Sequence, residues 1–322
     1  MDRVILDRKP QTVSWLNDEL VDWTSGEMYS LTGQVNRASK YHIGFSFDGA
    51  INSRDGVYSF IYQKKGTKGL LLKEGEILRE IDRSYYCANA YEFPAAFLSY
   101  QRRTFLAHCP KQYCQLDFED VETGELVTNL KSREPADFFH SRLEVSLNNE
   151  YLISKGWVWH PLDAARCYNV ADCFADPKNL DRMDLDTLDT GIEVCTATFI
   201  DNSTVLVGTS DEVLDDERMT LPPKSFGIWD LVKNNVSSIQ TPAYEFGNLF
   251  VINSRLAWDI YKFPKIIDLT NGNLVDKAED VFSGTQRSAI FHDSQPLLAF
   301  NNRRDRLAVS DGDKIVVLQA SL

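Results

Sequence analysis

The sequence contains no apolar run that approaches the roughly 18 to 20 residues needed to span a bilayer. Residues 1–15, MDRVILDRKPQTVSW, include neither a long apolar stretch nor a small-residue cleavage site, so they do not have the pattern of a secretory signal peptide. We therefore expect a cytoplasmic protein that does not bind membranes.

Closely spaced Cys-x-x-Cys pairs are also absent, although the chain contains six cysteines. The nearest approach to a metal cluster is His108-Cys109 followed by Cys114, and buried thiols are the simpler interpretation because free cysteine packs as a small hydrophobe. A cytoplasmic setting disfavours disulfides. We therefore predict no metal, no cofactor and six reduced thiols: Cys87, Cys109, Cys114, Cys167, Cys173 and Cys195.

Catalytic signatures are missing as well. There is no G-x-S-x-G, no H-E-x-x-H and no glycine-rich phosphate loop. The acidic segment LDRMDLDTLDTG (180–191) lacks the tighter spacing of a calcium loop, and we interpret it as a half-exposed strand. The five histidines are scattered, which favours core or strand-end positions over catalytic bases: His42, His108, His140, His160 and His292.

Positive charge is scarce, with 34 lysines and arginines against 47 acidic residues, a net charge of −13 and a pI near 4.9. Such a surface repels phosphate backbones, so nucleic acid is a poor partner. It would attract a protein with a basic surface, although acidity can also serve only to keep a chain soluble. We expect a chain that is monomeric on its own and that binds a basic protein.

One pattern recurs along the chain: a short apolar strand, a polar turn containing Gly or Asn, and a second apolar strand. The gaps between copies are about 40 to 50 residues, and RCYNVADCF (166–174) fills one double gap. Such spacing predicts four-stranded propeller blades. The copies are MYSLTGQV (28–35), GLLLKEGEILREI (69–81), QLDFEDVETGELVTNL (115–130), FGIWDLVKNNVSSI (226–239) and PKIIDLTNGNLVDK (264–277).

The two ends of the sequence complement each other. Residues 288–319 supply three strands for a last blade, the first of them at AIFHDS (289–294), but no fourth. The unused strand RVILD (3–7) would complete the blade beside KIVVLQ (314–319), which would leave no sheet edge unpaired. We therefore predict an all-β, seven-bladed β-propeller that occupies residues 1–322 as a single domain.

Several segments resemble the WD-repeat propeller family. VSLNNEYLIS (145–154) and ATFIDNSTVLVG (197–208) look like that family's inner strands around a short polar turn. Trp229-Asp230 lies where the family's Trp-Asp dipeptide ends a third strand, whereas Trp258-Asp259 falls on a predicted second strand and is interpreted as coincidence. The resemblance covers nearly the whole chain, but no blade has the family's Gly-His pair with its structural Asp.

Two segments break the repeat, and both join a second strand to a third. GWVWHPLDAA (156–165) contains Trp157, Trp159, His160 and Asp163, and DEVLDDERMTLPPK (211–224) is an insertion in the next blade. Because such loops emerge on one face of a propeller, we predict aromatic anchors beside a negative patch, the composition of a protein-binding surface. The alternatives are that the tryptophans fill the space between blades and that the loop is only solvated. The acidic residues of the insertion 211–224 are Asp211, Glu212, Asp215, Asp216 and Glu217.

These observations favour a non-catalytic protein-interaction platform, either a scaffold subunit or an antidote that caps a basic domain such as a nuclease toxin. The alternative is a propeller hydrolase or lyase with its site in the central channel, which would need inward carboxylates or histidines. The predicted first strands offer mainly apolar or hydroxyl side chains: GFSFDG (44–49), AAFLSY (95–100), EVSLNN (144–149), TATFID (196–201) and AIFHDS (289–294). We therefore predict no catalytic residue.

Overall fold

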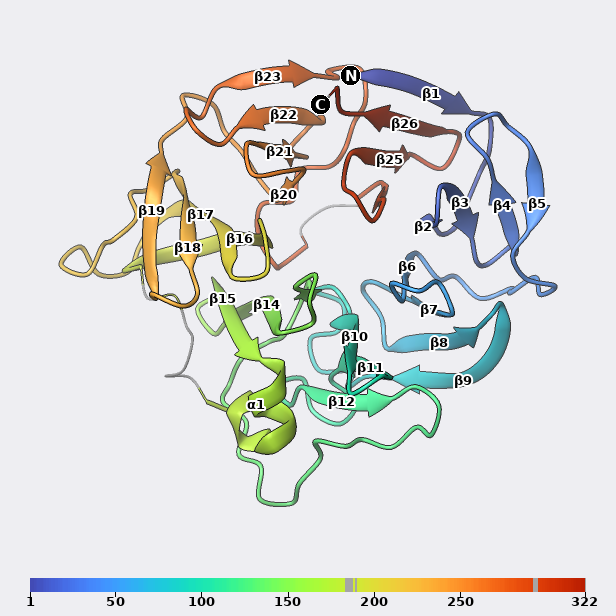
Figure 1. Cartoon of the computed structure of the whole chain (residues 1–322), viewed down its shortest axis with the longest axis horizontal. Helices are drawn as coiled ribbons and strands as arrows, with labels where there is room; N and C mark the ends of the chain where they lie inside the picture. The colour runs from blue at the N-terminus through green and yellow to red at the C-terminus, as the bar shows by residue number, and fades with distance from the viewer. Residues whose placement is uncertain (183–187, 189, 292–294, 322) are drawn as a thin grey trace.

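Seven small antiparallel sheets stand around a central axis in the computed structural model of this chain, which describes residues 1–182, 188, 190–291 and 295–321 (Figure 1). The described residues contain one short α-helix, α1 (Val170–Ala175), and one 3-10 helix, η1 (Pro177–Leu180). Neither helix is long and apolar enough to cross a membrane. The seven-bladed β-propeller predicted from the sequence is confirmed.

The strands of each blade follow one another in the chain and pair antiparallel with their neighbours. From the channel outward, blades one to four consist of β2 (Ser14–Leu16), β3 (Glu19–Asp22), β4 (Glu27–Tyr29) and β5 (Val35–Arg37); β6 (Gly49–Asn52), β7 (Tyr58–Tyr62), β8 (Lys68–Lys73) and β9 (Glu76–Asp82); β10 (Ala95–Tyr100), β11 (Arg103–His108) and β12 (Asp117–Asp120); and β13 (Glu144–Val145), β14 (Tyr151–Val158) and β15 (Leu162–Asn169). Blades five to seven consist of β16 (Ile192–Phe199), β17 (Thr204–Val213), β18 (Phe226–Asp230) and β19 (Asn235–Gln240); β20 (Leu249–Val251), β21 (Leu256–Asp259), β22 (Lys265–Asp268) and β23 (Leu274–Lys277); and β24 (Leu297–Phe300), β25 (Arg306–Ser310), β26 (Ile315–Gln319) and β1 (Asp2–Leu6).

The N-terminal strand completes the last blade, as predicted. β1 pairs antiparallel with β26 over five residues, from Asp2 opposite Gln319 to Leu6 opposite Ile315. Leu6 is buried in the apolar cluster between blades seven and one, whereas Ile5 points outward and is 56% exposed. The ring is therefore closed by backbone hydrogen bonds between the two ends of the chain.

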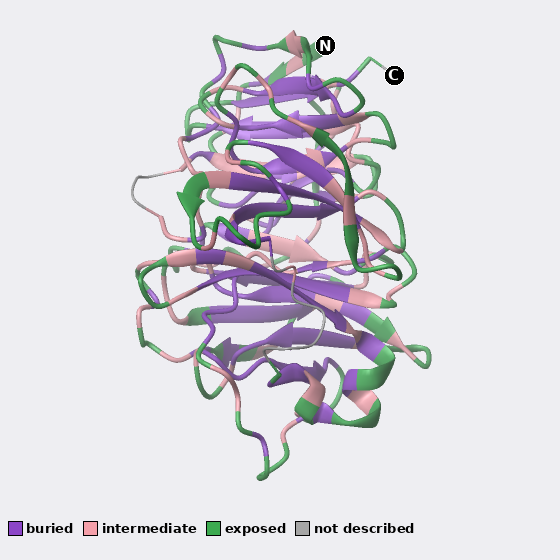
Figure 2. Cartoon of the chain, turned by 90° about the vertical axis from the view of Figure 1, so that its left-hand side faces the viewer, coloured by how far each residue is buried: buried purple, intermediate pink, exposed green. Residues whose placement is uncertain are grey.

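Apolar side chains fill the spaces between neighbouring blades. Trp15 and Leu20 of blade one, for example, pack against Ala308 and Val317 of blade seven. In Figure 2 most strands are buried, and exposure is concentrated in the loops and in outer strands such as β5 and β19. This packing fixes each blade relative to the next, so that the loops project from a rigid ring.

The Trp-Asp dipeptide of blade five occupies the position expected from the resemblance, since Trp229 and Asp230 end β18. The indole nitrogen of Trp229 donates to Oδ1 of Asn234 at 3.0 Å, and the Asp230 carboxylate accepts the backbone N–H of Lys233 at 2.9 Å. Trp258 lies on the second strand of blade six, as predicted.

Blades three and four depart from the predicted strand pattern. In blade four, RCYN ends β15 and the remaining residues form α1, because Asn169 caps the helix and Cys173 packs into the core. In blade three, the fourth strand is reduced to an isolated bridge between Glu119 and Leu126. The half-exposed strand expected at 180–191 includes residues 183–187 and 189, which lie outside those described, and its first residue, Leu180, belongs to η1.

Two first strands also lie later in the chain than predicted. Blade two begins with β6 at Gly49, because 41–48 forms the connection from blade one. Blade seven begins with β24 at Leu297, not at AIFHDS (289–294). Residues 289–291 contact blades three and four instead, and 292–294 are not among the described residues.

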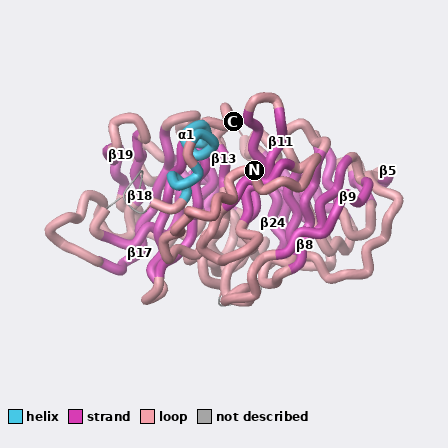
Figure 3. The backbone as a smooth tube through the Cα atoms, turned by 90° about the horizontal axis from the view of Figure 1, so that it is seen from below, coloured by secondary structure: helices cyan, strands magenta, loops and turns pink. Residues whose placement is uncertain are grey.

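Antiparallel order divides the loops between the two faces of the ring, which Figure 3 shows edge-on. Turns between second and third strands, together with the connections between blades, share one face, which we call the connection face. Turns between first and second strands lie on the opposite face. The connection from blade six to blade seven includes residues 284–291, which we call the strap. Its Ile290 forms a bridge with Tyr91 of the blade three connection, so the strap crosses the connection face.

Candidate functional site

The two tryptophans at the end of β14 have different environments. Trp157 is 3% exposed and stacks on Phe139, with ring centroids 3.7 Å apart and planes at 7°. Trp159 is 45% exposed and meets both rings edge-on, with centroids 5.4 Å from each. His160, the next residue, is also exposed, with a φ of 87°. Trp157 is therefore a core residue, and only Trp159 and His160 can contact a partner directly.

Further aromatic side chains extend this group into a layer on the connection face. The Tyr86 ring lies 4.9 Å from Tyr113 and 6.1 Å from Phe139, and Tyr113 stacks 4.3 Å from Phe139. Tyr86 also meets Trp159 edge-on at 6.4 Å. We call Tyr86, Tyr113, Phe139, Trp157 and Trp159 the aromatic layer.

Tyr85 directly precedes Tyr86 in the sequence and is 86% exposed, whereas Tyr86 itself is 43% exposed. Sequence reasoning missed both tyrosines and Phe139, because they lie in the connections between blades and not in the repeat, and it missed Tyr113 in the turn between β11 and β12. The only signal available was the density of aromatic residues in SYYCANAYEF (84–93).

Arg83 holds this loop in place. Its guanidinium is 5% exposed and donates to the carbonyl oxygens of Gly66 at 2.7 Å, Ala88 at 2.7 Å and Tyr91 at 2.9 Å, with two longer bonds to other carbonyls. It also lies 4.6 Å from the centre of the Tyr91 ring. A buried cation thus organises the segment that exposes Tyr85 and Tyr86.

Asp163, predicted as a binding residue, is buried instead. Its carboxylate accepts the backbone N–H of Ala289 at 2.9 and 3.0 Å and the Ser288 hydroxyl at 3.2 Å. Burial raises the pKa of Asp163 to about 7, with the Arg142 charge and these hydrogen bonds opposing that shift. Asp163 cannot reach a partner; it fixes the strap to blade four.

The insertion 211–224 lies between the second and third strands of blade five, as predicted, with 211–213 forming the end of β17. Its negative charge is smaller than its acidic residues suggested. Asp211 pairs with Lys224 at 2.9 Å and Asp215 with Arg218 at 3.4 Å. The remaining acidic side chains, on Glu212, Asp216 and Glu217, are exposed. The insertion also exposes apolar side chains that the sequence analysis did not single out: Val213 at 37%, Leu214 at 52% and Met219 at 40%.

Short contacts connect the insertion to the turn that carries Trp159. The backbone N–H of Asp163 donates to Glu193 at 2.7 Å, and the neighbouring Ile192 pairs with Val213 at the start of the insertion. Backbone N–H groups of Leu214 and Asp215 both donate to the Gly191 carbonyl at 2.9 Å. The structure therefore brings the two predicted segments onto adjoining parts of the connection face.

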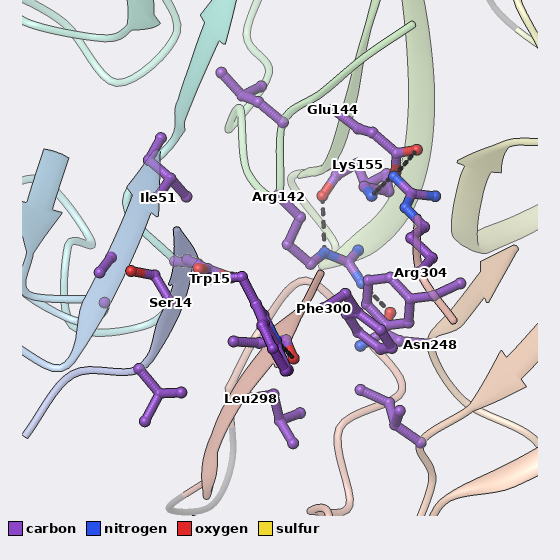
Figure 4. Close-up of a pocket in the computed structure, with 18 of the residues that line it drawn as sticks. Ser14, Trp15, Ile51, Arg142, Glu144, Lys155, Asn248, Leu298, Phe300 and Arg304 are labelled. Atoms are coloured by element: carbon purple, nitrogen blue, oxygen red, sulfur yellow. Dashed lines mark hydrogen bonds and ion pairs between the residues drawn. The ribbon is translucent and has the colours of Figure 1, made fainter. Parts of the chain in front are cut away.

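The central channel forms a second candidate site, with a cavity of about 520 Å³. Sequence reasoning missed its charged residues, because Arg142 precedes a two-residue strand and Arg304 lies in a turn. Glu144 accepts Lys155 at 2.9 Å and Arg304 at 2.7 Å (Figure 4). Although burial opposes its charge, these two cations lower the pKa of Glu144 to about 2. Glu144 is therefore ionised and fully paired.

Comparison with known proteins supports the fold. No family model matches the chain, and no curated protein sequence matches it. Among solved structures, a chain of the mitotic checkpoint complex matches with a TM-score of 0.61 and 9% identity, over 99% of this chain and 89% of that one. The β-propeller domain of Cps50 (Swd1) from Myceliophteria thermophila matches with a TM-score of 0.60 and 12% identity, over 99% and 100%.

A chain of hydrazine synthase from Kuenenia stuttgartiensis is also similar, with a TM-score of 0.61 and 10% identity, over 97% of this chain and 96% of that one. Similarity at these identities extends to the fold alone. The resemblance to WD-repeat proteins is accordingly supported as a shared propeller architecture over almost the full length of this chain.

Proposed function

We propose that this protein is a protein-interaction platform whose partner docks on the connection face of blades three to five. The observation that carries the proposal is the aromatic layer, because its buried half, Trp157 and Phe139, holds its exposed half, Tyr86 and Trp159, in fixed positions. Rigid tyrosine and tryptophan side chains that are apolar and half-exposed are the residues that most often anchor protein interfaces.

The charge around the aromatic layer favours a basic partner. The exposed carboxylates of Glu212, Asp216 and Glu217 lie on the adjoining insertion, and Tyr113 donates to Asp137 at 2.7 Å at the edge of the layer. The net charge of −13 would add long-range attraction. An apolar centre with a negative rim matches a basic protein surface that carries an apolar patch.

Two versions of this function differ in what the partner does. In one, the protein is a scaffold that holds a subunit in a larger assembly; in the other, it is an antidote that caps a basic domain such as a nuclease. A partner without enzymatic activity supports the scaffold, whereas a nuclease whose activity this protein suppresses supports the antidote.

The experiment is a comparative capture from the native host. Immobilised wild-type protein, Trp159→Ala, Tyr86→Ala and the control Leu147→Ala would be exposed to the same lysate. Leu147 is 57% exposed in the turn between β13 and β14, on the opposite face, so it matches the loss of apolar surface away from the proposed site. We expect a protein that wild type and Leu147→Ala retain and that both aromatic variants lose by at least about tenfold. Equal capture by all four proteins would refute docking on this face.

The alternative of a channel enzyme receives less support from the geometry. Glu144 is the one carboxylate in the charged cluster described above, and its oxygens accept Lys155, Arg304, the Thr198 hydroxyl at 3.0 Å and the backbone N–H of Phe199 at 2.9 Å. A carboxylate that is paired in this way, with a lowered pKa, is a poor proton acceptor. The cluster therefore suits binding better than acid–base catalysis.

A further inference from the structure

The central channel concentrates positive charge inside an acidic protein. Arg142, Lys155 and Arg304 gather around a single carboxylate, that of Glu144, which leaves a surplus of two positive charges in the cluster. Glu144 and Lys155 are each 9% exposed at the side chain, so water screens this surplus weakly. A cluster of this sign is unexpected in a chain of net charge −13, and a bound anion would offset it.

Arg142 has an unused donor in this cluster. Its Nε donates to the Lys155 carbonyl at 3.1 Å, and its Nη1 donates to the Cys195 carbonyl at 3.2 Å and to Oδ1 of Asn248 at 2.6 Å. Its Nη2 is buried and has no acceptor among the described residues. An unpaired buried donor on a cation destabilises the site, and an anionic acceptor would relieve that cost once a small shift of the Arg142 side chain turns Nη2 toward the channel.

The Asn248 side chain is oriented so that its amide group can donate to the same ligand as Arg142. Because its Oδ1 accepts from Arg142, its side-chain nitrogen is the atom left for a ligand, and this nitrogen makes no hydrogen bond within the described part of the chain. In Figure 4 the Arg142 guanidinium points toward Asn248 within the pocket, beside Phe300. Arg142 holds this position with a φ of 46°, in the left-handed region that non-glycine residues adopt uncommonly.

We propose that the central channel binds a small organic anion, with one carboxylate or phosphate group on Arg142 and Asn248 and an apolar body in the channel. A guanidinium and a fixed amide are the donors that such groups prefer. The cavity of about 520 Å³ lies in the size range of small-molecule sites. Apolar walls for the body of the ligand are supplied by Trp15, Ile51, Leu298 and Phe300 (Figure 4).

Other carboxylates that line the cavity are already bound to their own loops. Asp48 accepts the Lys64 N–H at 2.7 Å, Glu92 accepts the Tyr62 hydroxyl at 2.9 Å, and Asp201 accepts the Ser203 N–H at 2.8 Å. None of these three described carboxylates forms an ion pair with Arg142, whose guanidinium hydrogen bonds go to two backbone carbonyls and Asn248. Asp163, whose pKa is sensitive to the Arg142 charge, is held by the strap.

The strap determines how the ligand enters. It crosses the connection face, and its Phe291 donates a backbone hydrogen bond to the Ala90 carbonyl at 2.8 Å, so it covers part of the channel on that side. The cavity continues to the opposite face, where Leu147, Ile200 and Ile252 line it. We expect the ligand to enter from that face, which would leave the connection face free for a protein partner.

Isothermal titration of the full-length protein tests this proposal with four probes: phenyl phosphate, phenylacetate, inorganic phosphate and benzyl alcohol. We expect one site per chain for at least one aromatic anion, with an affinity at least about tenfold higher than for inorganic phosphate or for the neutral alcohol. Whichever aromatic anion binds more tightly shows whether the site prefers a phosphate or a carboxylate group. No saturable binding of either anion would overturn the proposal.

Two variants and one control locate the site. Arg142→Gln should weaken binding of the preferred anion by at least about tenfold, and Leu298→Trp should do the same by filling the channel without removing charge. Arg102→Gln removes the same charge from an exposed turn of blade three outside the cavity, and it should change affinity by less than about twofold. If Arg142→Gln does not fold, Leu298→Trp decides alone. Equal affinities in Leu298→Trp and wild type would refute the channel site.

Discussion

The Asp163 carboxylate accepts the backbone N–H of Ala289, 126 residues later in the chain, at 2.9 Å. This contact joins blade four to the strap, which belongs to the connection between blades six and seven. It places a buried carboxyl group where burial raises its pKa to about 7. The consequences of that position are measurable.

The stability contributed by Asp163 should fall as the pH rises. Because the folded-state pKa of Asp163 is raised above its unfolded value of 3.8, the folded protein holds the proton more tightly, and stability decreases between about pH 4 and about pH 7. A shift of that size corresponds to about 4 kcal/mol at most. Asp163→Asn keeps the shape and removes the titration, so its free energy of unfolding relative to wild type should rise over this pH range. A difference that does not vary with pH would show that Asp163 is already ionised in the folded protein.

Arg83 should be essential for the loop that exposes Tyr85 and Tyr86. Arg83→Met removes a buried cation that donates to carbonyl oxygens alone, leaving several of them without a donor, and it should lower the free energy of unfolding by about 3 to 5 kcal/mol. Urea denaturation gives the value, and Arg102→Met is the exposed control, expected to cost less than about 0.5 kcal/mol. A loss below about 1 kcal/mol for Arg83→Met would mean that the loop is held by other contacts.

Ring closure predicts unequal effects at two neighbouring positions of β1. Leu6→Ala should cost about 2 to 4 kcal/mol, because Leu6 is buried between blades seven and one. Ile5→Ala should cost less than about 1 kcal/mol, because Ile5 is 56% exposed. Deletion of residues 1–8 should destabilise the protein by about 3 to 5 kcal/mol or cause aggregation, since it exposes the edge of β26. A truncated protein that melts like the full-length one would contradict closure by β1.

The six cysteines should react at very different rates. Five are buried, and Cys87 is half-buried. Burial raises the pKa of Cys109 and Cys114, and it raises that of Cys195 to about 12, which suppresses the reactive thiolate. An aromatic disulfide reagent should therefore label one thiol quickly in native protein and six after denaturation, and Cys87→Ser should remove the fast reaction. Two or more fast thiols in the native protein would contradict the buried positions.

The fold could be predicted from the sequence because a propeller repeats its hairpins and because the spare strands at the two ends match. The prediction failed where a segment does not follow the repeat. Asn169 caps a helix where a hairpin was expected, and AIFHDS has a strand-like pattern although Ala289 and Ile290 belong to the strap. Alternating apolar residues predict a strand, but they do not specify which neighbour pairs with it.

The candidate site could be predicted only in part. Trp159 and the insertion were found because they interrupt the repeat, and their common face follows from topology. Tyr86 and Arg142 could not be found, because each acts through residues brought together from distant blades. Asp163 was expected at the surface and is buried, since the strap that covers it comes from more than a hundred residues later. Contacts of such long sequence separation leave no local signal.

Trp157 of β14 and Trp159, in the turn after it, give the sharpest test of the interaction surface, because one is buried and the other exposed. Trp157→Ala removes the ring stacked on Phe139 and should cost about 3 to 5 kcal/mol of stability. Trp159→Ala should leave the melting temperature nearly unchanged and reduce affinity for the captured partner by at least about tenfold, mainly through faster dissociation. Charge reversal at Glu212, Asp216 and Glu217 should instead slow association and weaken its salt dependence. Surface plasmon resonance separates the two effects. A Trp159→Ala protein that loses stability but keeps its affinity would show that Trp159 supports the aromatic layer without contacting the partner.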